Sequence, residues 1–110
     1  MVKNGKIKLG FTTILHDPRL RFDLTNNDYC IADCIYHLSH NPAGAVMGWC
    51  YAKRETIGSF FGLSRQSAQT IIKKLEIKGL VEVHQETKHL RTTQVWYENF
   101  VMFELEKRKV

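Results

Sequence analysis

The stretch ETIGSFFGLSRQSAQTIIKKLEIKGLV, Glu55–Val81, predicts two short helices joined by a tight turn, with a strand directly after them. In the second of these helices, apolar residues recur at positions i, i+3, i+4 and i+7, namely Ala68, Ile71, Ile72 and Leu75. This spacing places them in one stripe along the helix, which is typical of a helix that packs one side against a core.

The opposite face of the second helix is polar. At about 100° per residue, the centre of this face falls on Gln66, Thr70 and Lys73. The other exposed positions of the helix include Arg65 in its first turn and Gln69 and Lys74 at the flanks, whereas the first acidic residue is Glu76. Gln pairs with adenine and Arg with guanine, and cations attract phosphate. The face therefore predicts contact with nucleic acid.

The ends of the helix pair carry local signals. Ser64 is a predicted N-cap because its hydroxyl can accept a hydrogen bond from a free backbone N–H. Gly79 stands where a helix end favours a left-handed residue. Gly62 and Leu63 form the predicted turn, with Leu63 buried. A helical hairpin that only builds a core is the alternative reading of this segment.

The first helix of the pair is predicted to turn its apolar side inward. Ile57, Phe60 and Phe61 form that side, and Gly58 allows the two helices to approach closely. Ala52-Lys53-Arg54 precede this helix and bring two basic side chains, Lys53 and Arg54, to its start.

Short strands are expected around the pair. LVEVH (80–84) alternates apolar and polar residues, as a half-buried strand does, and TTQVWY (92–97) is the predicted returning strand. The polar segment 85–91 between them forms the tip of the hairpin, and VMGWCYA (46–52) is a further strand.

An earlier helix is predicted from Thr25 to about His40. Thr25 with Asp28 three residues later forms a near capping box, and Leu24 with Tyr29 forms a hydrophobic staple across it. The buried stripe of this helix comprises Ile31, Cys34, Ile35 and Leu38. Before it, FTTIL (11–15) is expected to be extended and HDPR (16–19) to form a turn, because proline disfavours helical geometry in its predecessor.

The whole chain has 110 residues, enough for one domain. Lys and Arg outnumber Asp and Glu by 16 to 11, a net charge of +5 that favours an anionic partner. No apolar run approaches the length of a membrane span, and the N-terminus lacks the apolar core of a signal peptide. Three cysteines form no disulfide framework, so a reducing cytoplasm is expected.

These elements predict an α+β fold, a mainly helical winged helix-turn-helix with a small antiparallel β-wing. Residues 1–24 form an N-terminal extension, 25–97 the winged domain, and 98–110 a C-terminal helix in which Phe100, Val101, Phe103 and Leu105 share one face.

The chain resembles, over residues 11–82, the winged-helix DNA-binding domains of phage and plasmid replication-initiation proteins. The extended lead-in FTTILHDPRL and Gly48-Trp49-Cys50-Tyr51 carry this likeness, whereas the Ser-Arg helix start and the LEIKGL ending are shared with many winged helices, including MarR-like bacterial regulators. The resemblance implies a bacterial DNA-binding protein that acts in transcription regulation or replication initiation. Replication initiators are usually longer, so a small regulator is an equal expectation.

Site residues follow from the resemblance. It implies base contacts from the first two turns of the recognition helix, at Ser64, Arg65, Gln66, Gln69, Thr70 and Lys73. It implies backbone contacts from the wing through Lys88, His89 and Arg91. Lys53 and Arg54 stand where family members usually have a Ser or Pro cap, and they add positive charge near the phosphates. Double-stranded DNA is the expected partner.

Other chemistries are weaker. Cys30, Cys34 and His37 share one helix face and could ligate zinc or sense thiol oxidation, but they overlap the buried stripe and have no Cys-x-x-Cys pair. The chain has neither a Gly-rich phosphate loop nor a metalloprotease motif, and no catalytic triad can be inferred, so we expect neither an enzyme nor a cofactor.

The apolar residues near the C-terminus have two possible roles, in the core or in a dimer contact. Trp96, Tyr97, Phe100, Val101 and Phe103 are many for a small domain, and they could either fill the core or form a homodimer seam with the helix 25–40. An interaction module that uses this scaffold without reading DNA is the alternative function.

Overall fold

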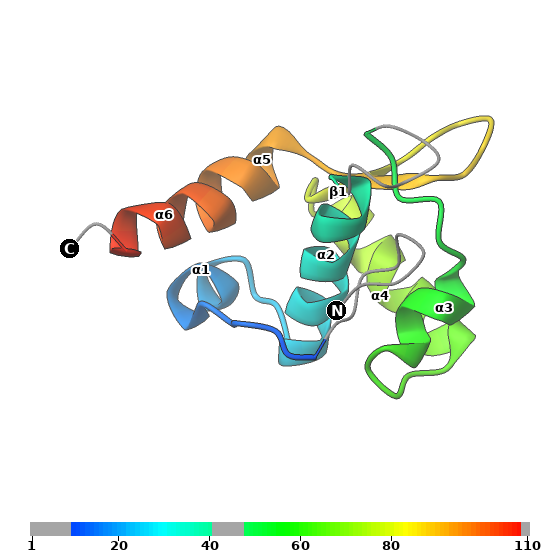
Figure 1. Ribbon diagram of the computed structural model, residues 1–110, viewed down its shortest axis with the longest axis horizontal. Coiled ribbons are helices and arrows are strands. Elements are labelled where there is room, and N and C mark those ends of the chain that lie inside the picture. Colours follow the sequence, from blue (N-terminus) through cyan, green and yellow to red (C-terminus); the bar gives the residue numbers. More distant parts are fainter. Residues whose placement is uncertain (1–9, 41–47, 109–110) are drawn as a thin grey trace.

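The computed structural model describes residues 10–40 and 48–108 as a mainly helical α+β fold with one antiparallel hairpin (Figure 1). Four helices precede the hairpin in the described ranges: α1 (His16–Arg21), α2 (Asn26–Ser39), α3 (Arg54–Ser59) and α4 (Arg65–Ile77). The hairpin comprises β1 (Val81–Val83) and β2 (Leu90–Thr92). A continuous C-terminal helix follows, made of α5 (Gln94–Trp96), the π-helical segment η1 (Tyr97–Val101) and α6 (Met102–Arg108).

Helix α2 begins as the sequence predicted. The Thr25 hydroxyl accepts from the backbone N–H of Asp28 at 3.0 Å, and the Asp28 carboxylate accepts from the N–H of Thr25 at 2.9 Å, which completes the capping box. Leu24 and Tyr29, on either side of it, are both buried. Asp28 also accepts from Lys74 Nζ on α4 at 2.5 Å, so one buried carboxylate starts α2 and ties it to α4.

The predicted turn at residues 16–19 is wrong, because these residues form the first part of α1. Pro18 occupies the third helical position, where a backbone N–H has no partner within the helix, so its missing donor costs little. Its ring is buried, and the next residue donates its N–H to the Leu15 carbonyl at 3.1 Å. Burial and helical bonding thus outweigh the extended preference of Asp17 before proline.

The α3–α4 pair is held at close range by Gly58. A methyl group in place of its Hα would lie 2.8 Å from the Leu63 carbonyl oxygen and 3.1 Å from the Ala68 Cβ. Gly62 in the turn has a φ of +69° and Gly79 after α4 a φ of +77°, both in the left-handed region that glycine adopts without strain. The predicted turn and helix stop are therefore confirmed.

Two side chains of this pair differ from expectation. Phe60 was predicted to point inward, but it is 37% exposed, because it follows the last residue of α3 at the start of the turn. Leu63 is only partly buried. The Ser64 N-cap is confirmed, since its hydroxyl accepts from the Ser67 N–H at 3.1 Å.

The hairpin is shorter than predicted. Val81 pairs with Thr92 and Val83 with Leu90, so the returning strand occupies residues 90–92 rather than 92–97. Residues 94–97 are helical because Thr93 caps α5 and because Trp96 and Phe100 reach the core from successive turns. Of the strand expected at 46–52, residues 46 and 47 lie outside the described ranges, and the rest contributes an isolated bridge between Cys50 and Leu90.

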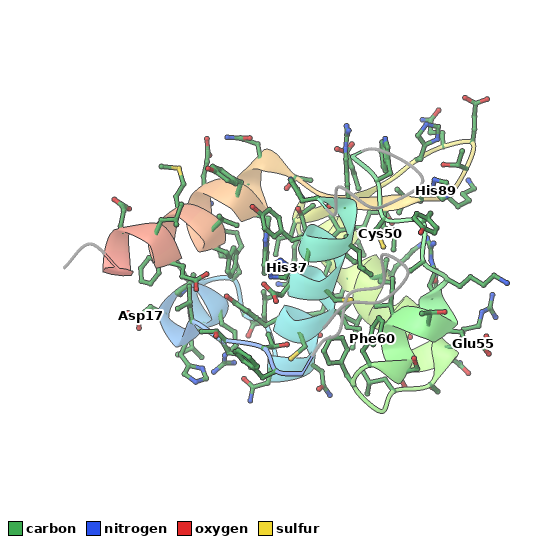
Figure 2. The ribbon with its side chains drawn as sticks, viewed as in Figure 1. Asp17, His37, Cys50, Glu55, Phe60 and His89 are labelled. Atoms are coloured by element: carbon green, nitrogen blue, oxygen red, sulfur yellow. The ribbon has the colours of Figure 1, made fainter. Side chains whose placement is uncertain are left out.

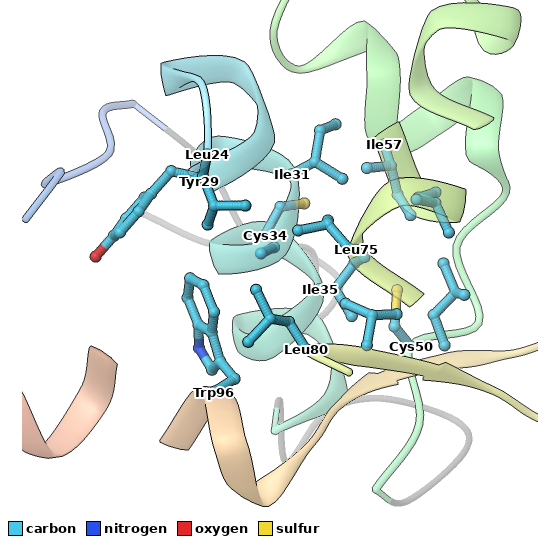
Figure 3. Close-up of a cluster of buried hydrophobic side chains, with 14 of the residues drawn as sticks. Leu24, Tyr29, Ile31, Cys34, Ile35, Cys50, Ile57, Leu75, Leu80 and Trp96 are labelled. Atoms are coloured by element: carbon cyan, nitrogen blue, oxygen red, sulfur yellow. The ribbon is translucent and has the colours of Figure 1, made fainter. Parts of the chain in front are cut away.

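The core lies between α2, α4, the hairpin and the C-terminal helix (Figure 3). Ile31, Cys34 and Ile35 of α2 are buried at its centre, and Leu38 packs at its edge. Trp96 stacks on Phe100 with ring centroids 4.1 Å apart, and Tyr29 packs against both rings. The largest C-terminal aromatics therefore fill the core of this chain itself.

Among the described helices, none combines the length and the apolar composition needed to cross a lipid bilayer.

Candidate nucleic-acid interface

The polar face of α4 is exposed and lines an open hollow of about 1150 Å³. Most of the predicted base-contacting residues meet there with two residues from other elements: Arg54, Arg65, Gln66, Gln69, Thr70, Lys73 and Lys88. Figure 2 shows Glu55 on α3 and His89 on the hairpin at the same end of the molecule, opposite Asp17 on α1. The hollow thus combines α4, the start of α3 and the hairpin turn in one surface.

Positive charge dominates this hollow. Its lining contains five basic residues and one acid, Glu76, and among the basic residues Lys74 is already paired with Asp28. The side chains of Arg65, Gln66 and Lys73 make no hydrogen bond or ion pair with another described residue. They are therefore available to a ligand, and the surplus of cations favours an anionic one.

Arg54 joins the three elements of the hollow. Its Nε donates to Gln69 Oε1 on α4 at 3.2 Å, and its Nη1 donates to the Lys88 carbonyl in the hairpin turn at 2.8 Å. Burial lowers the pKa of Arg54, and the neighbouring charge of Arg65 lowers it further. A guanidinium remains protonated at neutral pH all the same. Arg54 was predicted to contact phosphate, and its donors to Gln69 and Lys88 give it an internal role as well.

Hydroxyl groups on α4 are partly committed to the helix itself. The Thr70 hydroxyl donates to the Gln66 carbonyl at 3.0 Å, so its oxygen and methyl group are what it presents outward. Ser64 acts as the N-cap, and it lies beside the hollow in a shallower depression that also includes Asn27 and Ser67. Asn27 had not been singled out in the sequence, because it belongs to α2 and only the packing of α2 on α4 brings it there.

The hairpin turn is built by His84. Its Nδ1 accepts from the backbone N–H groups of Glu86 and Thr87 at 3.1 and 3.2 Å, and Lys88 closes the turn with a φ of +65°. Lys88 is exposed and lines the hollow, whereas His89 is half-buried and does not. Lys53 is exposed at the start of α3, outside the hollow.

Arg91 lies elsewhere than predicted. It was expected in the hairpin tip but belongs to β2, where its Nε donates to Glu82 Oε1 across the hairpin at 2.7 Å. Its guanidinium also lies 4.2 Å from the centre of the Trp49 ring. The Glu82 carboxylate thus balances the charge of Arg91, and the Trp49 ring stacks on its guanidinium. Arg91 makes these contacts because the returning strand begins at Leu90, which places Arg91 in the strand pair and not at the tip.

The cysteines and His37 of α2 do not converge on a shared centre. Cys34 is buried, and burial raises the pKa of its thiol, while Cys30 is only partly buried. His37 is instead paired with Asp33, because its Nε2 lies 3.4 Å from Asp33 Oδ2. This hydrogen bond raises the pKa of His37. Within residues 10–40 and 48–108, no three His, Cys, Asp or Glu side chains are grouped as a metal site.

Comparisons with family models, with curated proteins and with solved structures gave no match to this chain.

Proposed function

We propose that the chain is a winged helix-turn-helix domain that binds double-stranded DNA in transcription or replication control. In this proposal α4 is the recognition helix in the major groove, and the β1–β2 hairpin is the wing that approaches the phosphate backbone. The observation that carries the proposal is the hollow in which the exposed polar face of α4 adjoins Arg54 and Lys88.

The dimensions of α4 suit this role. Its 13 residues make a helix of about 20 Å, and the major groove of B-DNA is about 12 Å wide and admits a helix with its side chains. The apolar side of α4 is anchored by Ala68, Ile72 and Leu75, which are buried, so the polar face is held outward. A rigidly held helix loses little entropy on binding, which favours selective contact.

The side chains divide by chemistry. Arg65 and Gln66 in the first turn carry the hydrogen-bonding groups that read base edges. Lys73 and Lys88 are point charges that suit phosphates, and Lys53 extends the positive surface beyond the hollow. Arg91 is assigned no DNA contact, because Glu82 and Trp49 already engage its guanidinium.

Binding to a random-sequence duplex at varied salt tests this assignment. Fluorescence anisotropy between about 50 and 200 mM salt should show an affinity that falls steeply, with a slope of roughly 0.9 per neutralised phosphate. Lys73→Ala and Lys88→Ala should each reduce the slope by about that amount. Arg21→Ala is the matched control, since it removes one exposed charge from α1. An affinity that is independent of salt and of an Arg65/Lys73 double substitution would refute the proposal.

Self-association is a second candidate function, carried by a different observation. The expected seam on α2 has little apolar surface left, because its stripe is buried within the chain. The C-terminal helix, however, still exposes Val95, Tyr97, Met102 and Leu105, each 37 to 47% accessible. A homodimer would pair these helices, and sedimentation equilibrium tests it: Leu105→Glu should convert a dimer to a monomer, whereas a wild-type monomer at all concentrations excludes the seam.

A further inference from the structure

The side chain of Gln69, on the exposed face of α4, is held in a defined orientation by a charged partner from another element, Arg54 at the start of α3. Its Oε1 lies 3.2 Å from Arg54 Nε, fifteen residues away in sequence. The same guanidinium is anchored at its other side by the Lys88 carbonyl at 2.8 Å. Arg54 is itself half-buried at the start of α3, so the group that holds Gln69 is fixed at both ends.

The chemistry of this contact decides which way the Gln69 amide points. A guanidinium has only donors, so the amide atom that faces it must be the oxygen. The two N–H bonds of Nε2 then lie on the other branch of the planar amide. Since Gln69 is exposed and lines the hollow, these donors are what it offers to a ligand there.

An unrestrained glutamine recognises adenine by using both amide atoms, because its oxygen accepts from N6–H and its nitrogen donates to N7. In this chain a charged donor already engages one of the two lone pairs of that oxygen, and charge-assisted hydrogen bonds are stronger than neutral ones. The N6–H of adenine would have to share that oxygen with Arg54. Guanine presents two acceptors, N7 and O6, and makes no such demand.

We propose that Gln69 selects guanine over adenine at its base pair and that Arg54 is the positioning residue that imposes this choice. The inference rests on the proposed function, because it requires α4 to lie in the major groove. It differs from the general pairing rule for glutamine in the base it predicts, and it makes one residue of α3 a determinant of sequence preference without base contact.

Three variants test the inference on a duplex selected by the wild-type protein. The base pair read by Gln69 is first located as the position at which Gln69→Ala loses its preference. At that position the wild type should favour guanine over adenine roughly tenfold, within the range of one good base contact. Arg54→Met frees the amide oxygen and should shift the preference to adenine. Gln69→Glu keeps a partner for Arg54 but has no donor, so it should abolish the guanine preference and favour cytosine, whose N4 donates.

Gln66→Glu is the matched control, because it makes the same chemical change at a neighbouring glutamine of α4 that has no Arg54 contact. It should weaken binding to the selected duplex and change the preference at its own base pair, but leave the guanine preference at the Gln69 position intact. Circular dichroism melting shows whether each variant folds. If Arg54→Met does not fold, Gln69→Glu still tests whether Gln69 reads guanine through its N–H donors, since its carboxylate can accept the same bond from Arg54.

The possible outcomes separate the two proposals. A guanine preference that moves to adenine in Arg54→Met or to cytosine in Gln69→Glu supports the inference. A wild-type preference for adenine, or a guanine preference unchanged in both variants while binding persists, overturns the inference and leaves DNA binding standing. A wild-type protein that binds no duplex at all overturns both.

Discussion

Replacing Gly58 by alanine should destabilise the fold, although alanine is the better helix former. The added methyl group would lie 2.8 Å from the Leu63 carbonyl oxygen and 3.1 Å from both the Ser64 carbonyl oxygen and the Ala68 Cβ. None of these atoms is the flexible end of a side chain. The Leu63 backbone is also tied back to α3, because its N–H donates to the Gly58 carbonyl at 2.9 Å. The turn or α3 must therefore move as a unit to admit the methyl group.

The expected size follows from two opposing terms. Glycine in a helix costs roughly 0.5–1 kcal/mol relative to alanine, which Gly58→Ala would recover. Overpacking of a close contact costs about 1–3 kcal/mol, so the net loss of unfolding free energy should be about 1–2 kcal/mol. In a domain of this size that corresponds to a lower Tm by about 4–10 °C.

Urea and thermal unfolding measure this change. Thr56→Ala is the control, because Thr56 is exposed on the same helix and its replacement tests the propensity term without the clash. We expect this control to be neutral or slightly stabilising. DNA affinity should fall in Gly58→Ala even where it is folded, since α3 carries Arg54. If Gly58→Ala proves as stable as the control, the close approach of α3 to α4 is wrong.

Three further results are expected. Asp28→Ala removes the capping box of α2 and the ion pair to Lys74 of α4, and it should lower the free energy of unfolding measured in urea by about 2 kcal/mol. The loss is no larger because the Lys74 ammonium left without its partner is partly solvated. The hydrogen bond to Asp33 raises the pKa of His37 above its ordinary 6.5. The contribution of this pair to the free energy of unfolding is therefore fully present below pH 6.5, and it is lost as the pH rises through the raised pKa. NMR titration should find that raised midpoint, and Asp33→Asn should lower it. Arg91→Ala should lower the Tm of the free protein but leave the salt slope of DNA binding unchanged, whereas Lys88→Ala should do the reverse.

Local signals in the sequence predicted the parts of the fold that local chemistry controls. The capping box at Thr25, the N-cap at Ser64 and the left-handed Gly79 all appear where the sequence placed them. The end of the hairpin, by contrast, does not lie where the sequence placed it. TTQVWY is rich in β-branched and aromatic residues, as strands are, but Trp96 and Phe100 gain more by entering the core from successive helical turns, and this gain depends on where Tyr29 lies.

The same distinction holds at the candidate site. The angular positions of α4 correctly predicted that Gln66, Thr70 and Lys73 are exposed, because one helix determines its own faces. The partners of Gln69 and Arg91 were not predictable, since Arg54 and Trp49 are distant in the chain and reach them only through the packing of α3 and the hairpin. Tertiary contacts thus decide which polar groups remain free to bind.

Amide chemical shifts, mapped during titration with a selected duplex, show whether α4 and the hairpin turn form the DNA-binding surface. The proposed surface predicts that the largest changes fall on residues 65–73 and 85–88, with α1 and α6 little affected. Changes confined to α1 and the C-terminal helix, with residues 65–73 unmoved, would contradict it.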